Sequence, residues 1–160
     1  MIIRPATAAD ADAIWGILEP VIRAGETYTF PRDWSRADAM VYWHASDHAV
    51  LVAEDIGVVV GTYYLRANQR GGGAHVANCG YVTDIHASGR GIARAMCLHS
   101  MDLAVAKGFT AMQFNFVVST NERAVRLWKR LGFAIVGTLP AAFQHPGLGL
   151  VDAYVMYRKL

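Results

Sequence analysis

Hydrophobic positions recur with helical spacing near the start of the chain. Residues 2–4, Ile-Ile-Arg, are predicted to form a short strand. Thr7 to Asp10 then has the spacing of a helix-capping box, with aspartate in place of glutamate. The apolar residues that follow predict one helical face: Ile14, Ile17, Leu18, Val21 and Ile22. We expect Pro20 to kink or interrupt this helix, and a second helix to cover residues 35–45.

Strand-like runs dominate the middle of the chain. The expected strands are 49–53, 58–67, 76–85 and 111–118. A tight turn at Glu54 to Gly57 joins the first two, and Gln69 to Ala74, with three successive glycines, is expected to be a flexible loop. An amphipathic run from Arg90 to Lys107 predicts a helix between the last two strands.

The last third predicts one helix and two closing strands. Ser119 to Glu122 has capping-box spacing, with Ser119 as the expected N-cap. The apolar face of this helix is Ala124, Leu127, Trp128 and Leu131. Gly132 is expected to end the helix, and strands are expected over 133–139 and 151–157.

The resulting order is β-α-α-β-β-β-α-β-α-β-β. It predicts one α/β (α+β) domain over residues 1–160, with a mixed sheet covered by helices on both faces. A chain of 160 residues is long enough to bury a core without disulfides or metals.

Composition and charge narrow the classes of function. Hydrophobic residues make up 54% and charged residues 18%, as in a globular chain. The net charge of +2 is too small to indicate binding to nucleic acid or membrane. Cys79 and Cys97 have neither metal-site nor redox spacing, and we expect no metal. The N-terminus lacks an apolar run of signal-peptide length, so we expect a cytoplasmic protein.

Ser88-Gly89-Arg90-Gly91-Ile92-Ala93 is the segment richest in candidate chemistry. Glycines between a strand and a helix let backbone N–H groups approach a ligand. The helix N-terminus favours an anion, and Arg90 adds a full positive charge. The segment predicts a pyrophosphate-binding loop; the alternative is an ordinary strand-to-helix turn.

Two motifs together resemble the GNAT superfamily of acetyl-CoA-dependent N-acetyltransferases. Residues 83–93, Thr-Asp-Ile-His-Ala-Ser-Gly-Arg-Gly-Ile-Ala, are similar to the family's strand and glycine-rich loop. Asn121 to Phe133 is similar to the family signature Asn-x-x-Ala-x-x-Leu-Tyr-x-x-x-Gly-Phe. The resemblance implies a mostly antiparallel sheet of six to seven strands with about four helices, acetyl-CoA as co-substrate, and a homodimer.

The resemblance also implies which residues bind acetyl-CoA. Backbone groups around Thr83 and Ile85 should pair with the pantetheine arm like an added strand. Asn121 should bind the pantetheine or lie near the thioester, although its side chain could instead only cap the helix. The implied cofactor-binding residues are Thr83, Asp84, Ile85, Ser88, Gly89, Arg90, Gly91, Ile92, Ala93, Arg94, Asn121 and Trp128.

Three positions depart from the family pattern. Ser88 replaces a longer phosphate donor, for which Arg90 or Arg94 could compensate. Trp128 replaces the tyrosine that many relatives use as general acid, and an indole N–H cannot supply a proton at neutral pH. Asn78 stands where the phosphinothricin acetyltransferase branch has a glutamate base. An amide cannot take up a proton there, but it can orient the amine or a water.

The acceptor is the least determined part of the prediction. Glu26-Thr27-Tyr28-Thr29-Phe30 resembles the phosphinothricin and methionine-sulfoximine acetyltransferase branch. Asn78, Asn115 and Asn121 resemble, more closely, fungal N-acetyltransferases of proline analogues, and we take these three as the catalytic candidates. Asn115 could bind the substrate carboxylate or be a satisfied buried amide.

The resemblance leads to an N-acetyltransferase acting on the amine of a small amino acid or toxic analogue. The aromatic candidates for the acceptor pocket are Tyr28, Phe30, Trp34, Tyr63 and Tyr81. Glu26 and Asp84 are the candidate bases, with proton loss to water as the alternative. Acetylation of a protein N-terminus or ribosomal protein, and acetyl-CoA binding without catalysis, remain open as competing functions.

Overall fold

The computed structural model describes residues 1–160, and its elements follow the predicted order. The strands are β1 (Ile2–Pro5), β2 (Ala49–Asp55), β3 (Val58–Ala67), β4 (Val76–Thr83), β5 (Ala111–Val118), β6 (Ala134–His145) and β7 (Gly149–Lys159). The helices are α1 (Ala11–Ala24), α2 (Arg36–Trp43), α3 (Ile92–Ala106) and α4 (Glu122–Arg130). Single 3₁₀ turns occur at η1 (Ala8–Asp10), η2 (Gly71–Gly73) and η3 (Ile85–Ala87).

All seven strands form one sheet in the order β1-β2-β3-β4-β5-β7-β6. Every neighbouring pair is antiparallel except β4 and β5, which are parallel because α3 crosses between them. The mixed, mostly antiparallel sheet and the four helices confirm the predicted fold class.

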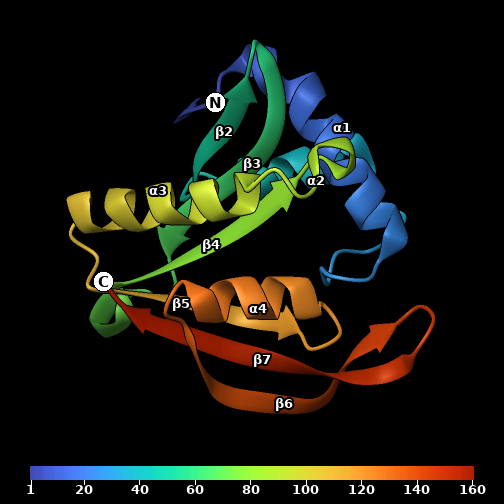
Figure 1. Ribbon diagram of the computed structural model, residues 1–160, viewed down its shortest axis with the longest axis vertical. Coiled ribbons are helices and arrows are strands. Elements are labelled where there is room, and N and C mark those ends of the chain that lie inside the picture. Colours follow the sequence, from blue (N-terminus) through green and yellow to red (C-terminus); the bar gives the residue numbers. More distant parts are fainter.

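The sheet is split between its two parallel strands. Strands β4 and β5 pair only through Val76 with Ala111 and Ala77 with Met112, and then diverge (Figure 1). Immediately beyond these pairs, Asn78 Nδ2 donates a hydrogen bond of 2.9 Å to the Gln113 carbonyl. The facing edges of the two strands therefore carry backbone groups with no strand partner.

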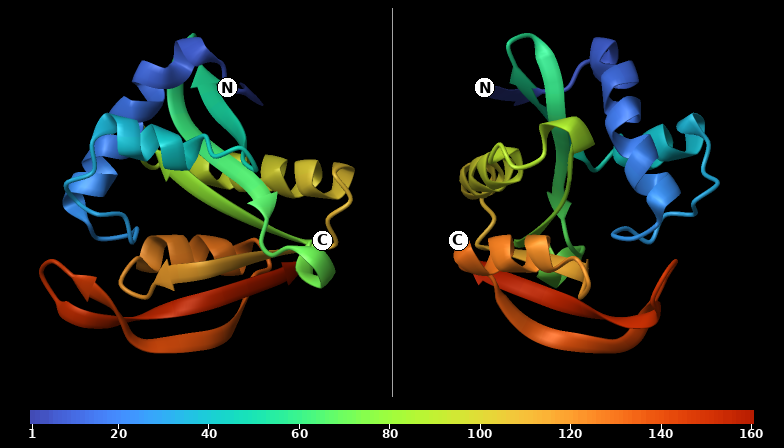
Figure 2. Two further views of the ribbon diagram at one scale, coloured as in Figure 1. Left: turned by 180° about the vertical axis from the view of Figure 1, so that it is seen from behind. Right: turned by 45° about the vertical axis from the view of Figure 1, so that its right-hand side comes forward.

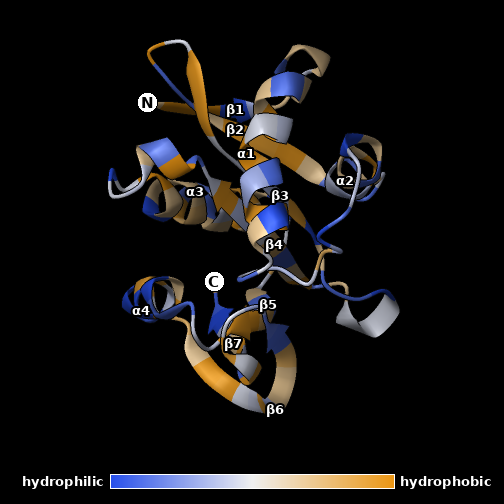
Figure 3. Ribbon diagram, turned by 90° about the vertical axis from the view of Figure 1, so that its right-hand side faces the viewer, coloured by the Kyte–Doolittle hydropathy of each residue, from blue (hydrophilic) through white to orange (hydrophobic).

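Two hydrophobic cores lie on opposite faces of the sheet. Residues of α3 and α4 pack with one face, whereas α1 and α2 pack on the other (Figure 2). Figure 3 views the molecule from the side toward which β4 and β5 diverge, and its central strands are largely hydrophobic while α4 is mostly hydrophilic. None of the four helices combines the length and apolar character needed to cross a bilayer.

Helix α1 continues through Pro20, so the predicted interruption is wrong, while the alternative, a kink, stays a prediction. Proline removes one hydrogen bond, the one to the carbonyl four residues earlier. That carbonyl belongs to Gly16, while Ile14, Leu18 and Ile22 are buried on both sides of it. Tertiary packing of this apolar face outweighs the local cost of proline.

The N-cap of α4 is Asn121, not the predicted Ser119. Asn121 Oδ1 accepts a hydrogen bond of 3.3 Å from the Ala124 amide. Ser119 is instead held by its own amide, which donates to the Asp152 carbonyl of β7. A long-range backbone contact thus overrides the local capping-box spacing.

Strand boundaries also differ from the predicted ones. Strand β4 ends at Thr83 because Asp84 turns the chain, its side chain accepting a hydrogen bond from the His86 amide. Strand β6 extends beyond Leu139 through Pro140. Proline is tolerated there because β6 is an edge strand and its register shifts between Leu139 and Phe143.

The β2–β3 hairpin turns on two residues with positive φ, Ile56 at 50° and Gly57 at 76°. Such turns favour Asn-Gly because an isoleucine side chain is strained in the left-handed region. The Ile56 side chain is 96% exposed and makes no compensating core contact. We expect Ile56→Asn to raise the free energy of unfolding by about 1 kcal/mol, measured by urea denaturation. An unchanged or lower value would contradict this reading of the turn.

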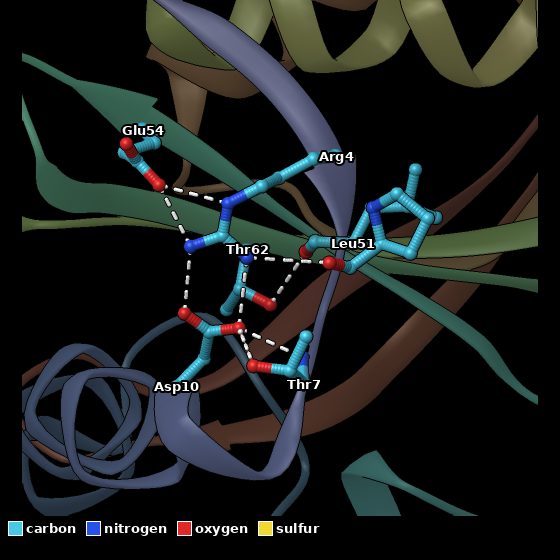
Figure 4. Close-up of polar contacts among 7 residues, drawn as sticks. Arg4, Thr7, Asp10, Leu51, Glu54 and Thr62 are labelled. Carbon is cyan, nitrogen blue, oxygen red and sulfur yellow. Dashed lines mark hydrogen bonds and ion pairs between the residues drawn. The ribbon is translucent and has the colours of Figure 1, made fainter.

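A buried carboxylate ties the N-terminal segment together (Figure 4). Asp10 accepts hydrogen bonds from the Arg4 guanidinium at 2.8 and 2.9 Å and from the Thr7 amide and hydroxyl at 2.7 and 2.9 Å. Arg4 also bonds Glu54 on β2 at 2.8 Å. These contacts hold the pKa of Asp10 well below its usual range, chiefly through Arg4. They fix the start of α1 against the sheet.

Candidate active site

A cavity of about 850 Å³ opens where β4 and β5 diverge. Its volume lies in the range of small-molecule and cofactor sites. One end is formed by the segment before α3 and the first turns of α3 and α4. The other end is formed by the chain after α1, by α2 and by the middle of the sheet. The split sheet thus connects two chemically different ends.

The loop before α3 presents unpaired backbone donors. Gly89 and Gly91 have φ of 87° and 79°, and Gly91 caps α3. The amides from Gly89 to Arg94 donate to no backbone carbonyl and to no side chain. Successive amides in such a loop, backed by a helix N-terminus, form an anion-binding nest.

Three free arginines line the cavity: Arg94 and Arg123 lie in the first turns of α3 and α4, and Arg130 is the last residue of α4. None of them is in an ion pair, so their charge is available to a ligand. Arg123 approaches the loop, with Nη2 3.9 Å from where a Cβ on Gly89 would lie. Arg123 was not among the residues expected from the sequence; its position two residues after Asn121, in the first turn of the helix, is the signal that could have found it.

Two further polar groups border the cavity with atoms left free. Asn121 uses Oδ1 to cap α4, and its Nδ2 has no partner. Trp128 packs against Tyr81 and Phe114, with ring centroids 5.3 and 5.2 Å apart, and its indole N–H has no partner. Arg66 Nε is the one fully buried side-chain nitrogen or oxygen without a partner, so the free Asn121 and Trp128 nitrogens retain access to the cavity.

The opposite end of the cavity has aromatic walls. Tyr28, Phe30, Tyr42 and Tyr64 line it. Phe30 stacks on Tyr28 at 4.8 Å and meets Tyr42 edge-on at 5.0 Å. The Tyr64 ring covers Gly80, where a Cβ would lie 2.6 Å from Tyr64 Cε1. This end suits an apolar or compact organic group.

Asn78 and Arg66 are the polar groups nearest this aromatic end. They face each other across the β3–β4 pair, so their side chains lie on the same face of the sheet. Asn78 is 6% exposed, with Nδ2 bound to Gln113 and Oδ1 unbonded. Arg66 was not expected from the sequence either, and a lone arginine in an apolar strand was the available signal.

Asn115 lies at the cavity wall but is exposed and engaged on both sides. Its Nδ2 donates to Asn68 Oδ1 at 2.7 Å, and its Oδ1 accepts from Gln113 Nε2 at 2.9 Å. It is therefore neither a buried amide nor an unpaired donor.

Several predicted site residues lie outside the cavity. Arg90 points away from it and pairs with Asp55 at the end of β2. Asp84 caps η3, and Ile85 lies within that turn with its side chain 53% exposed, so neither extends the strand as expected. Trp34 stacks on Phe30 at 5.0 Å behind the wall.

The remaining predicted residues are brought together at the cavity. From the cofactor set these are Thr83, Ser88, Gly89, Gly91, Ile92, Ala93, Arg94, Asn121 and Trp128; from the acceptor set they are Tyr28, Phe30, Asn78, Tyr81 and Asn115. Tyr81 turns its hydroxyl toward Ser100 of α3, at 2.7 Å, and its carbonyl accepts from the Tyr28 hydroxyl at 2.9 Å. Tyr63 is buried and bonds His99 at 2.7 Å, away from the cavity.

No aspartate, glutamate, histidine or lysine lines the cavity. The exposed Glu26 is not part of its wall. Burial raises the pKa values of Tyr28, Tyr64 and Tyr81 well above the usual value, and raises the pKa of the Cys79 thiol to about 12. These groups all stay protonated at neutral pH. The wall therefore offers arginine cations, neutral donors and amide oxygens, but no group that takes up a proton near pH 7.

Comparison with known proteins agrees with this geometry. A family model described as "Acetyltransferase (GNAT) family" matches residues 16–133. A GCN5-related N-acetyltransferase from Kribbella flavida is 40% identical, with a TM-score of 0.95 over 99% of this chain and 97% of that one. A phosphinothricin acetyltransferase from Sinorhizobium meliloti in complex with acetyl-CoA shares the fold, at 23% identity and a TM-score of 0.87 over 99% and 88% of the two chains.

A curated relative gives a shorter match. The N-acetyltransferase aca1 of Schizosaccharomyces pombe is 33% identical over 98 residues, which are 61% of this chain and 47% of that protein. The match thus spans about half the length of the curated relative. Together with the split sheet, the glycine-rich loop and the family match over most of the sequence, it places the chain among proteins of one family. The chain belongs to the GNAT acetyltransferase family.

Proposed function

We propose that this protein transfers the acetyl group of acetyl-CoA to the amine of a small amino acid or toxic amino-acid analogue. One observation carries the proposal: the same cavity holds an anion-binding end and an aromatic end on either side of a split sheet. The coenzyme binds at the anion-binding end and the acceptor at the aromatic end, and the gap between β4 and β5 brings the thioester and the amine together.

The donor end fits the coenzyme. The free amides of Gly89–Arg94 bind the pyrophosphate, and Arg94, Arg123 and Arg130 supply positive charge for its phosphates. The pantetheine arm adds to the unpaired edge of β4 as a short strand. Asn121 Nδ2 donates to the arm, which would give this residue a binding role besides capping.

Transfer then proceeds by direct attack. The neutral amine attacks the thioester carbonyl, the carbon–sulfur bond breaks, and the amine proton passes to water. A backbone N–H on the unpaired β4 edge near Thr83 stabilises the developing oxyanion, which is worth about 3 kcal/mol in other oxyanion holes. The Trp128 indole N–H donates a hydrogen bond to the departing thiolate, without giving up its proton. Asn78 orients the acceptor, while Asn115 lines the cavity with both of its polar ends bonded to Gln113 and Asn68.

A screen for thiol release tests the proposal. The purified protein and acetyl-CoA are mixed with amino acids that include proline analogues, methionine sulfoximine and phosphinothricin, and products are identified by mass. We expect catalytic release of CoA with at least one small amino acid. Release only with peptides bearing a protein N-terminus would favour the protein-acetylating alternative. Binding of acetyl-CoA without release to any acceptor would identify a non-catalytic binding protein.

Arg123 offers a test of the donor end alone. Removing one charge-assisted phosphate contact costs about 1.5 kcal/mol, or about tenfold in affinity. Arg123→Ala should therefore raise the Kd for acetyl-CoA about tenfold, measured by calorimetry. Arg126→Ala is the matched control, because Arg126 lies on the same helix, pairs with Glu122 and does not line the cavity. Equal effects from both variants would exclude a specific role for Arg123.

Three coarser expectations accompany this function. Residues 1–160 act as one N-acetyltransferase domain, and two copies form a homodimer, as the family resemblance implies. A cytoplasmic location is expected from the composition. Each of these stays a prediction.

A further inference from the structure

The Arg66 side chain carries a positive charge that no hydrogen bond within the protein satisfies. Its Nε is buried and has no hydrogen-bond partner, although the residue lines the cavity. The nearest anion, Asp47 Oδ2, is 3.9 Å from Nη1, beyond hydrogen-bond distance, and the Asp47 side chain is 61% exposed. The Arg66 side chain as a whole is 30% exposed, but its buried Nε lacks an acceptor, so a ligand that supplies one gains affinity.

The surroundings of Arg66 define what that ligand is. A guanidinium prefers a carboxylate, which it binds through two parallel hydrogen bonds. Asn78 lies directly across the strand pair, with its Oδ1 free to accept from an amine. Side chains at such positions are about 5 Å apart at Cβ. One carbon separates the amine from the carboxylate in an α-amino acid, so a single molecule can reach both groups.

We propose that Arg66 binds the α-carboxylate of the acceptor while Asn78 Oδ1 receives its amine, so that the acceptor is a free α-amino acid. This inference rests on the proposed acetyl transfer and narrows its substrate class. The acceptor side chain then faces the aromatic wall of Tyr28, Phe30, Tyr42 and Tyr64. The Arg66 guanidinium makes no hydrogen bond within the protein, so none has to break when it binds the ligand.

This assignment moves the carboxylate role away from Asn115. Both polar ends of Asn115 are already bonded to Asn68 and Gln113, whereas Arg66 has an unused donor and a full charge. With Arg66 in this role, the site distinguishes free amino acids from peptides. The first residue of a peptide carries an amide where an amino acid carries the α-carboxylate. A protein N-terminus would leave Arg66 unpaired.

Equilibrium binding tests the inference without relying on turnover. L-methionine and L-methioninamide, and L-proline and L-prolinamide, are titrated calorimetrically into protein saturated with CoA, which lacks the transferable acetyl group. In the wild-type protein we expect each amino acid to bind about thirtyfold more tightly than its amide, as for a lost charged hydrogen bond. In Arg66→Gln the affinity for the amino acids should fall to that for the amides, while the Kd for acetyl-CoA stays unchanged.

Two controls make the outcome decisive. Arg66→Lys keeps the charge but loses the two-point contact, so it should retain part of the preference for the carboxylate. Arg70→Gln removes an exposed arginine three residues from the end of β3 and outside the cavity, and it should change nothing. Equal wild-type affinity for amino acid and amide, a preference that survives in Arg66→Gln, or no binding of any of the four compounds would overturn the inference.

The failure of this inference and the failure of the proposed function look different. If the wild-type protein releases thiol with amines and amides as readily as with amino acids, Arg66 does not select a carboxylate but acetyl transfer stands. If no acceptor of any kind releases thiol, acetyl transfer itself is wrong, whatever the calorimetry shows.

Discussion

Replacing Gly91 with valine is expected to weaken acetyl-CoA binding about a hundredfold, which corresponds to about 2.7 kcal/mol. Gly91 caps α3 with φ of 79°, a conformation that a β-branched residue adopts only with strain. We expect the loop of the valine variant to rotate and so relieve this strain. The free amides of Gly89–Arg94 then no longer point toward one ligand. Calorimetric titration with acetyl-CoA measures the loss.

Gly108 provides a matched control for this substitution. It lies just beyond the other end of α3 and has φ of 86°. A Cβ added at Gly108 would meet open space, as it would at Gly91. Gly108→Val should therefore lower the melting temperature to a similar extent and leave acetyl-CoA affinity unchanged, because Gly108 is outside the cavity. If Gly91→Val bound acetyl-CoA as tightly as Gly108→Val does, the loop would not be the phosphate site.

Replacing Asp10 with asparagine is expected to lower the free energy of unfolding at pH 7 by about 3 kcal/mol, because it removes two charge-assisted hydrogen bonds from Arg4, each worth about 1.5 kcal/mol. The Asp10 side chain is 7% exposed and accepts four hydrogen bonds, two of them from Arg4. An asparagine there keeps the shape but loses the charge and turns an amide toward the guanidinium. Urea denaturation of the two proteins gives the difference directly.

The effect should depend on pH with a defined sign. The pKa of Asp10 is lower in the folded than in the unfolded protein, so the unfolded state binds more protons as the pH falls. The contribution of Asp10 is thus complete above about pH 4, the ordinary carboxyl pKa, and declines below it. The gap between wild type and Asp10→Asn should narrow below that pH. Asp38→Asn, at an exposed capping box on α2, should cost less at every pH.

Periodicity and turn chemistry predicted most of the fold. The order of the eleven main helices and strands follows from the apolar spacing, and β5 is bounded as predicted at Ala111 and Val118. The errors occur where distant segments override local preference: Pro20 inside a packed helix, Ser119 bound to β7, and Pro140 on an edge strand. These contacts depend on segments that are distant in the sequence, so local sequence patterns do not predict them.

The candidate site divides in the same way. Gly89 and Gly91 have the backbone conformation that the motif requires, because the local sequence largely determines the local backbone conformation. The direction of a long side chain, in contrast, is not determined by the local sequence. Arg90 lies in the loop motif yet pairs with Asp55, whereas Arg123 and Arg66 reach the cavity from other elements. Tertiary packing decides which arginine faces the ligand, and sequence patterns indicate this packing only weakly.

Direct attack by a neutral amine, without a side-chain base, is tested by the pH dependence of kcat/KM for two amino acids whose amines differ in pKa. The cavity wall holds no carboxylate or histidine, and burial raises the pKa values of Tyr28, Tyr64 and Tyr81. We predict that kcat/KM rises tenfold per pH unit up to the amine pKa of each acceptor, and that the midpoint moves with the acceptor. A midpoint between about pH 5 and pH 8 that is the same for both acceptors would reveal an enzyme base and exclude this mechanism.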